Sequence, residues 1–485
     1  MRFQPVVLWS DAAIWLLVAA IAVYAVVVVR NANLRASWRR VFLDAPAFAS
    51  AVVLLLCIGV TLLDSLHYRP RLPPTPGAPA GAVVYDARTL SALDAALSGL
   101  IASREATYSI PLAAHGFTKE SVVVAGEARR VAPRLVSGGA HLADPDRDAA
   151  ADIARRAAIG LVAGLAAALA VAALAVLAIA RSGSAPFGAT FRAIVRRETA
   201  VPWFAPLATL VVVGALAGPT VSLAQAWHVL GTDLTGNDVL YLSLKSIRTA
   251  FVIGTLATLA TLPVAVVLGI AAGFLRGWVD EAVQYVYTVF SSVPNVLLIA
   301  ACVLMVQGFL DRNPNLFETS LERADLKLFL LCVVLGLTTW PGLARLLRGE
   351  AMKLRELEYV QAATAFGVGK GRIMVRHIFP NVAHLVLIVT VLEFSTLVLY
   401  EAVLTYVGVG VDPSMNSFGG MINLARNEMS RDPVVWWSFA AAFGFMVTLV
   451  LAANLFADGV RDAFDPRHRA ARPLAARRAR EKAAA

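Results

Sequence analysis

Apolar residues in this chain are grouped into long runs that short polar stretches separate. A helix needs about 20 mostly apolar residues to cross a bilayer, and runs of about that length predict nine membrane spans. The predicted spans are residues 12–29, 47–63, 154–180, 203–223, 250–275, 285–307, 328–346, 383–409 and 436–458. Of the 485 residues, 58% are apolar and 16% are charged, which is more apolar side chain than a soluble core requires. The sequence therefore predicts an all-α, polytopic membrane helix bundle.

Basic residues predict how this bundle is oriented. The arginine-rich segments are residues 30–40, 181–197, 345–376 and the tail from Arg461. They all fall on one side if every span crosses once, and the positive-inside rule makes that side cytoplasmic. The N-terminus is then outside and the C-terminus inside, although Arg155 and Arg156 lie on the outer side. The arginines directly after the first span, with no evident cleavage site, favour a membrane helix over a signal peptide.

The polar segments divide the chain into five predicted regions. Residues 1–63 contain the N-terminal spans. Residues 64–152 form a small, partly helical extracytoplasmic lobe that begins with a proline-rich stretch, residues 70–79. Residues 153–230 form a helix pair, residues 231–465 the main bundle, and residues 466–485 a basic cytoplasmic tail. Spans 47–63 and 203–223 are both candidates for the core helix that precedes the main bundle. We favour 203–223 because it leads directly into residue 231, which leaves the first three spans as an elaboration.

Glycines spaced four residues apart predict two close helix crossings. Gly160 and Gly164 lie in the third span, and Gly269, Gly273 and Gly277 follow one another at the end of the fifth. Small residues at this spacing let two helix backbones approach closely. They indicate packing and identify no function.

Net charge and cysteines narrow the class of protein. The formal net charge of +10 comes from basic residues clustered beside the spans, as expected for cytoplasmic loops and not for a nucleic-acid-binding face. Cys57, Cys302 and Cys332 all lie inside apolar runs, where cysteine behaves as a small apolar residue. The sequence therefore indicates no disulfide framework, no metal site and no cofactor.

The loop after the seventh span is predicted to be helical and cytoplasmic. Good helix formers run from Glu358 to Phe366, and Gly367 is placed to end that helix in the left-handed conformation. A second short helix, residues 370–379, is predicted to lead back to the membrane until Pro380 interrupts it.

This loop has the composition of a docking element. Ala362 and Ala363 would allow close contact with a partner, and Tyr359 and Phe366 are candidate anchors. A short helix with these features fits a groove on another protein. An amphipathic helix lying on the bilayer is the alternative reading of the same residues.

The loop resembles the EAA loop of ABC-importer permeases, whose pattern is Glu-Ala-Ala, three residues, Gly, nine residues and Ile-x-Leu-Pro. The residues in register are Gln361, Ala362, Ala363, Gly367, Phe379 and Pro380. The chain departs from the pattern at three positions: Gln361 replaces the Glu, His377 the Ile and Phe379 the Leu.

Further matches resemble the dipeptide, oligopeptide and nickel branch of that family. They are Gly231-Thr232-Asp233, Gly236-Asn237-Asp238, Gly277 to Glu281, Trp340-Pro341-Gly342, Glu401 with Gly408-Val409-Gly410, Asp458 to Asp462, and Asp465-Pro466. The family usually has Arg in place of Asn237. This ordered series covers about residues 231–467, and its order and spacing make it specific.

The resemblance implies a permease subunit of a bacterial inner membrane, with a core of five to six helices of the ABC type I importer kind. Residues 354–367 would form a coupling helix that enters a cleft on a separate ATPase. The implied partners are a second permease, two ATP-binding subunits and an extracytoplasmic substrate-binding protein. Peptides are the expected cargo, and nickel or another small solute is the alternative.

No enzymatic activity is expected of the chain itself. It has no Gly-x-x-x-x-Gly-Lys-Ser/Thr phosphate loop, and the nearest approach, residues 367–371, lacks the hydroxyl and the first Gly. ATP is therefore expected to bind to the partner subunits.

Two acidic residues lie within the eighth span. Glu393 and Glu401 are eight residues apart, so they share roughly one helix face. A carboxylate in lipid costs about 2.5 kcal/mol or more, so this face is expected to look into the bundle. Both are candidate residues of a translocation path, and hydrogen bonding to a neighbouring helix is the alternative for Glu393.

The loop before the fifth span places Asp233, Asn237 and Asp238 among glycines. Turns and helix caps use these residue types far more often than cation sites do. We assign this loop to the outer mouth of the permease, without a metal.

A rival hypothesis is an ion-coupled secondary transporter that uses Glu393 as a proton site and needs no ATPase. It predicts inverted repeats and broken helices, which the sequence does not indicate. A membrane enzyme is also disfavoured, because no loop groups His, Ser and Cys residues into a catalytic constellation.

Overall fold

The computed structural model describes residues 3–72, 85–86, 88–124, 127–314, 317 and 319–464. Nine helices of this part of the chain are long and apolar enough to cross a membrane, which confirms the predicted polytopic bundle. The predicted tail 466–485 and most of the proline-rich stretch 70–79 lie outside the described residues.

The bundle is built on two long helices that cross closely, α9 (Val239–Leu275) and α12 (Ser320–Arg355). A Cβ atom added to Gly269 would lie 2.7 Å from the carbonyl oxygen of Ala344, and one on Gly273 would lie 2.5 Å from that of Arg348. The predicted crossing at these two glycines is therefore confirmed. Gly277 has open space around it and a φ of +59°, so it forms a turn and not part of the crossing.

Three more helices surround this pair: α15 (Phe379–Tyr406), the short α16 (Phe418–Glu428) and α17 (Trp437–Phe464). Side chains that cap helices fix where two of the long helices begin. The Asp238 carboxylate accepts from the amide of Leu240 at 2.8 Å at the start of α9, and Thr319 accepts from the amide of Glu322 at 3.3 Å at the start of α12. Such caps satisfy amides that a helix leaves without an internal partner.

The predicted span 285–307 is broken into two helices. The structure has α10 (Trp278–Ser292) and α11 (Asn295–Arg312), with Val293 extended and Pro294 between them. Proline has no amide hydrogen and pushes the residue before it out of the helical conformation, so the apolar run does not continue as one helix. Of the two, only α11 meets the length and hydropathy of a span.

The N-terminal helices are α1 (Trp9–Arg30), the short α2 (Ala32–Val41) and α3 (Ala45–Asp64). Helix α3 packs against both α9 and α17, whereas α8 (Phe204–Leu223) packs against α6 (Pro145–Ser182) and α3. The expectation that 203–223 is the core helix is therefore not supported by packing. Because α3 contacts α9, the packing instead favours α3 as the core helix that precedes the main bundle.

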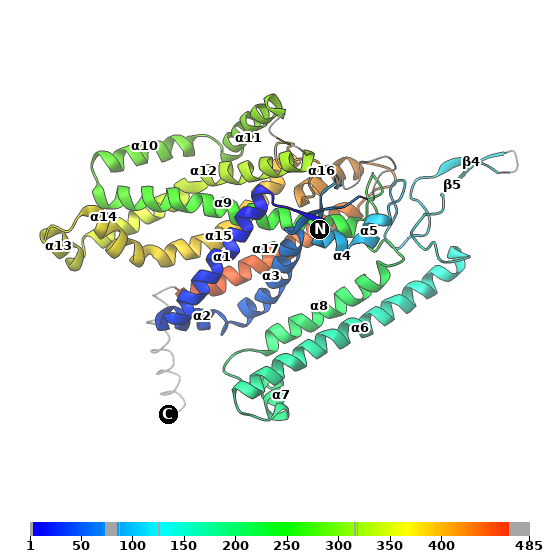
Figure 1. The fold of residues 1–485 in the computed structure, drawn as a ribbon, viewed down its shortest axis with the longest axis horizontal. Helices are drawn as coiled ribbons and strands as arrows, with labels where there is room; N and C mark the ends of the chain where they lie inside the picture. The colour runs from blue at the N-terminus through cyan, green and yellow to red at the C-terminus, as the bar shows by residue number, and fades with distance from the viewer. Residues whose placement is uncertain are drawn as a thin grey trace, which may run out of the picture.

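Helices α6 and α8 form a hairpin that runs at an angle below the other helices in Figure 1, joined by α7 (Phe187–Val195). Gly160 and Gly164 of α6 face Gly218 and Gly214 of α8, and a Cβ on Gly164 would lie 2.2 Å from the Gly214 carbonyl oxygen. The predicted small-residue crossing is confirmed, with α8 as its partner. Replacing any of these glycines would force the two backbones apart.

The lobe between α3 and α6 contains strands as well as helices. Strand β2 (His67–Pro70) pairs antiparallel with β1 (Phe3–Val6) and β3 (Leu90–Ser91), and β4 (Glu120–Val124) pairs with β5 (Glu127–Val131). Two short helices, α4 (Ala92–Ala96) and α5 (Ser98–Ala102), follow β3. Strand β1 precedes the first span, so the start of the chain lies at the lobe end of the bundle (Figure 1).

Arg155 and Arg156, which lie against the charge trend, are held by a buried acid. The Asp152 carboxylate is 2.8 Å from each guanidinium, and it also accepts from the Trp227 indole at 3.1 Å. Asp152 is 6% exposed, so both arginines form ion pairs with the same buried carboxylate beside the lobe. The single Asp152 carboxylate offsets part of their charge, and the orientation of the chain stays a prediction.

A buried charge cluster joins α1 to the core. Arg248 of α9 lies 2.6 Å from Asp11 of α1 and 3.8 Å from Asp325 of α12, and these three residues are at most 3% exposed. His67 approaches Asp11 at 2.7 Å, and Ser10 donates to Asp325. The N-terminal helix is therefore tied to both central helices by charge, within the part of the chain that the structure describes.

Candidate functional site

Helix α13 (Glu358–Ala365) stands at the end of the bundle opposite the lobe (Figure 1). Phe366 closes it by donating its amide to the carbonyl of Ala362 at 3.0 Å, and Gly367 follows with a φ of +74°. The amide of Val368 then returns to the carbonyl of Ala363 at 3.1 Å. The predicted termination at Gly367 is confirmed, because only glycine adopts this backbone conformation cheaply.

One side of α13 is anchored on the core. Val360 is 1% exposed and belongs to the same buried cluster as Leu347, Ile373 and Ile378. This cluster combines residues of α9, α12, α13 and the return segment to α15. A shift of α13 would therefore push directly on the ends of membrane helices, since packed side chains transmit strain.

Polar contacts also hold together the helix ends on which α13 packs. Arg348 forms two bonds to Asp280 at 2.6 and 2.8 Å, which fixes α12 to α10. Arg355 donates to the carbonyl of Phe274 at 3.0 Å. The Arg348 guanidinium holds the pKa of the Asp280 carboxyl below its ordinary value. Sequence reasoning did not identify these arginines as functional, although Asp280 lies in one of the matched motifs.

The other side of α13 is open. Phe366 is 88% exposed and Tyr359 is 45% exposed, and Glu358, Gln361 and Ala362 are exposed as well, whereas Ala363 is half-buried. Gln361 donates to the carbonyl of Glu356 at 3.1 Å, so its amide steadies the turn that enters α13. A short rigid helix with an exposed aromatic anchor at its end has the form of a docking element.

The predicted interruption at Pro380 is wrong. Residues 370–373 form α14 and residues 374–378 a π-helical turn, which runs without a break into α15. Pro380 lies in the first turn of α15, where a missing amide hydrogen is tolerated. Nearby, Asn381 donates to the Tyr359 hydroxyl at 3.2 Å and so ties α15 to α13.

Glu393 and Glu401 lie on the same helix, α15, but in different environments. Glu401 is 1% exposed and accepts from the Thr405 hydroxyl at 2.8 Å. Glu393 is partly exposed and makes no hydrogen bond or ion pair with any residue that the structure describes. Exposed Thr396, Leu399 and Val403 follow Glu393 at helical spacing, so it begins an open stripe of α15.

The loop of Asp233, Asn237 and Asp238 lies at the lobe end, far from α13 (Figure 1). Asp233 accepts from the amides of Thr235 and Asn237, each at 2.8 Å, and Asp238 caps α9. These are the bonds of a turn and a helix cap, as the residue types indicate. Asn237 also donates to the Thr235 hydroxyl at 2.6 Å, so all three residues serve the shape of the loop.

The lobe is fastened to this loop by a buried histidine that sequence reasoning missed. His228 is 2% exposed, with Nδ1 2.8 Å from Asp238 and Nε2 3.3 Å from Glu105 of the lobe. Glu105 also accepts from the amides of Val136, Ser137 and Gly138. The two carboxylates raise the pKa of His228 to about 9, against the opposing effect of burial. Residues so far apart in sequence carry no local pattern that could have revealed the contact.

Replacing His228 with glutamine is expected to flatten the pH dependence of stability. The pKa of His228 is raised to about 9 in the folded chain, so its stabilising contribution is complete below about 6.5 and is lost as the pH rises through 9. Hydrogen bonds from His228 and from the backbone amides of Val136, Ser137 and Gly138 outweigh burial and lower the pKa of Glu105 to about 2, so its contribution disappears only in strong acid. Midpoints of thermal unfolding between pH 6 and pH 10 measure the effect.

His115→Gln is the matched control, since His115 is 37% exposed and its acidic neighbour, Asp146, is 84% exposed. The control should keep the slope of the parent chain. An unchanged slope in His228→Gln would contradict the assignment.

Comparison with known proteins gives concordant matches. A family model described as the binding-protein-dependent transport system inner membrane component matches residues 265–470. The chain is 29% identical over 273 residues to the oligopeptide transport system permease protein OppC of Haemophilus influenzae, an alignment covering 56% of this chain and 80% of that protein. The OppC protein of Mycobacterium bovis is 31% identical over 245 residues, with 50% and 78% covered.

Two further proteins are similar to parts of this chain. A putative peptide permease protein of Brucella suis is 29% identical over 246 residues, covering 50% of this chain and 75% of that protein. Among solved structures, a chain of the MetNI methionine ABC transporter in an inward-facing conformation is 18% identical, with a TM-score of 0.33. That alignment covers 46% of this chain and 93% of the other.

Proposed function

Because this chain belongs to the inner membrane components of binding-protein-dependent transport systems, as an ABC-importer permease of the peptide branch, we propose that it imports peptides with energy from a separate ATPase. The observation that carries the proposal is the geometry of α13. One side is buried in the ends of the membrane helices through Val360, and the other presents Phe366 to a partner. Such a helix is suited to convert closure of an ATPase into movement of the bundle.

The sidedness of the chain follows from this proposal. Helix α13 would lie in the cytoplasm of a bacterial cell, and the lobe and the N-terminus outside the inner membrane. Residues 231–465, with the coupling loop 350–381, would act as the permease core together with α3. The mouth near Asp233, Asn237 and Asp238 would then receive cargo from an extracytoplasmic substrate-binding protein.

The assembly we propose contains this chain, a second permease and two ATP-binding subunits. The exposed stripe of α15 that begins at Glu393 would face the second permease across the translocation path. Glu401 has a different role, because its carboxyl is buried against Thr405 inside the chain. The rival secondary transporter finds no support among the relatives, whose names are those of permease proteins of transport systems.

Affinity purification in mild detergent tests the dependence on an ATPase. The parent chain should co-purify with an ATP-hydrolysing subunit, and Gly367→Val should lose it, because a β-branched residue resists a φ of +74°. Gly371→Val is the matched control, since Gly371 lies in the same loop with open space around it and no positive φ. Equal recovery of the ATPase with both variants would contradict the role of α13.

Replacing Glu393 with glutamine is expected to reduce uptake of cationic peptides selectively. Glu393 is a partly exposed carboxylate inside the bilayer with no partner among the described residues, so a cationic group passing along α15 would be its counter-ion. A hydrogen bond to a charged group contributes about 1.5–3 kcal/mol, which predicts a roughly tenfold or greater rise in KM for a lysine-rich peptide. Initial uptake rates of lysine-rich and neutral peptides give the comparison.

Glu401→Gln serves as the control on the same helix. It should affect all peptides alike, because Glu401 acts on the packing of α15. Equal KM changes for cationic and neutral peptides in Glu393→Gln would remove the path-lining role.

A further inference from the structure

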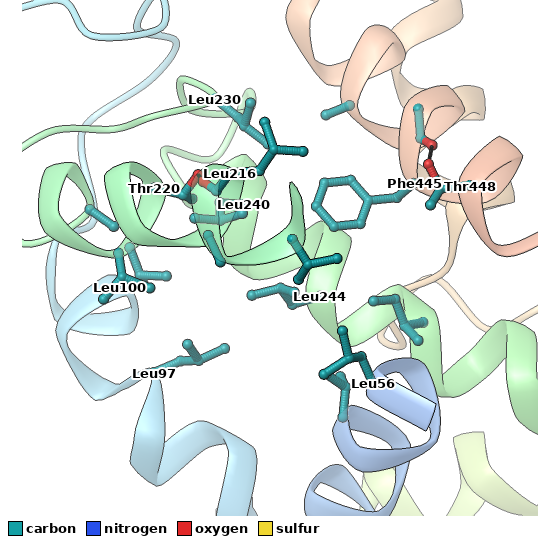
Figure 2. Close-up of a pocket in the computed structure, with 18 of the residues that line it drawn as sticks. Leu56, Leu97, Leu100, Leu216, Thr220, Leu230, Leu240, Leu244, Phe445 and Thr448 are labelled. Carbon is teal, nitrogen blue, oxygen red and sulfur yellow. Dashed lines mark hydrogen bonds between the residues drawn. The ribbon is translucent and has the colours of Figure 1, made fainter. Parts of the chain in front are cut away.

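A large cavity separates the α6–α8 hairpin from the core. Its volume is about 1010 Å³, at the upper end of the ~300–1,000 Å³ typical of ligand pockets. Figure 2 shows side chains that line it from four helices: Leu216 and Thr220 of α8, Leu240 and Leu244 of α9, Leu56 of α3, and Phe445 and Thr448 of α17. Leu97 and Leu100 of the lobe lie over one end.

The cavity lies toward the lobe end of the membrane helices. Its wall residues come from the end of α3, the end of α8, the start of α9 and the start of α17, which are residues 53–60, 213–221, 240–247 and 437–449. All four of these helix ends lie on the lobe side. The cavity is therefore at the depth of the acyl chains of the leaflet on that side.

The lining offers almost no polar recognition. Thr220 donates its hydroxyl to the carbonyl of Leu216 at 2.8 Å, and Thr448 donates to that of Gly444 at 2.8 Å. The indole of Trp437 donates to the carbonyl of Thr232 at 2.9 Å. These polar groups are satisfied by the protein backbone, so the remaining surface, made largely of Leu, Val, Ala and Phe side chains, suits an apolar occupant.

An apolar chain has a way in from the bilayer. Leu216 and Val221 of α8 are 68% and 63% exposed, and Trp436 beside α17 is 54% exposed. These lining residues mark an opening between α8 and α17. No residue of α11, α12 or α15 is among the lining residues, so the cavity is separate from the stripe that begins at Glu393.

We propose that this cavity binds the acyl chains of a phospholipid from the leaflet on the lobe side. The lipid fills the space between the hairpin and the core, beside the contact that α8 makes with α3. Its position does not depend on the cargo or on the ATPase. A transmembrane segment of another protein is the competing occupant, and the opening between α8 and α17 would have to admit it.

Cavity-filling variants test the proposal on the full chain in its assembled transporter. Ala217→Phe and Gly444→Phe place a ring in the cavity, and a side chain at Gly444 meets no atom within 4 Å. Val212→Phe and Val447→Phe are matched controls on the same helices, since both residues are exposed and neither lines the cavity. The probe is phosphatidylglycerol, counted by native mass spectrometry after detergent purification and after adding it back to delipidated protein.

The parent and the controls should retain a phospholipid that the filled variants lose, with an occupancy at least tenfold lower in the latter. Added phosphatidylglycerol should raise the unfolding temperature of the delipidated parent and controls, but not that of the filled variants. Equal lipid retention by filled and control variants would overturn the proposal. So would a photocrosslinker at Leu216 that captures a protein segment and no lipid.

Discussion

Replacing Phe366 with alanine is expected to weaken binding of the ATPase subunit by roughly 30-fold while leaving the isolated chain as stable as before. Phe366 is 88% exposed, so the folded chain loses almost no packing when the ring is removed. An aromatic anchor at the centre of an interface contributes about 2 kcal/mol or more, which corresponds to this factor. Titration of detergent-solubilised chain with ATPase subunit measures the dissociation constant.

Phe191→Ala provides the control for that measurement. Phe191 is 52% exposed on α7, at the other end of the bundle from the lobe, but on the hairpin instead of the coupling loop. The control should bind the ATPase like the parent chain. Equal affinities for the parent and Phe366→Ala would show that α13 docks without its aromatic anchor.

Replacing Arg248 with leucine is expected to destabilise the chain by about 3–5 kcal/mol, because removing one partner of a buried ion pair leaves an uncompensated charge. Asp11 lies 2.6 Å and Asp325 3.8 Å from this guanidinium, and both carboxylates are at most 1% exposed. The loss should detach α1 from α9 and α12. Thermal unfolding and protease access to the segment around α1 report it.

An exposed ion pair gives the matched comparison. Arg323 pairs with Asp311, and the two side chains are 44% and 49% exposed. Arg323→Leu should therefore cost only about 0–1 kcal/mol. Similar shifts for Arg248→Leu and Arg323→Leu would contradict a structural role for the buried cluster.

The membrane helices were predictable because a bilayer selects for one simple local property, a long apolar run. The helix end at Gly367 was predictable for a similar reason, since it depends on a single local conformation. The break between α10 and α11 was signalled by Pro294, but the apolar residues on both sides concealed it. At Pro380 the π-helical turn absorbed the change that proline was predicted to cause.

The connections between distant segments could not be predicted from the sequence. Glu105 meets His228, and Asp11 meets Arg248, across more than one hundred residues in each case. Such pairs depend on how the helices pack, and no periodicity records their proximity. For the same reason the sequence favoured α8 as the core helix, whereas in the structure α3 makes the contact with α9. Adjacency in sequence to residue 231 does not determine which helix packs against α9.

Reconstitution tests the central claim, that transport by this chain depends on a separate ATPase that acts through α13. The full assembly is placed in proteoliposomes, and uptake of a labelled peptide is measured with ATP, without ATP, and with a proton gradient alone. We predict uptake only with ATP on the side of the ATPase, and its loss in Gly367→Val but not in Gly371→Val. Uptake that a proton gradient drives without ATP, and that Gly367→Val leaves unchanged, would contradict the account.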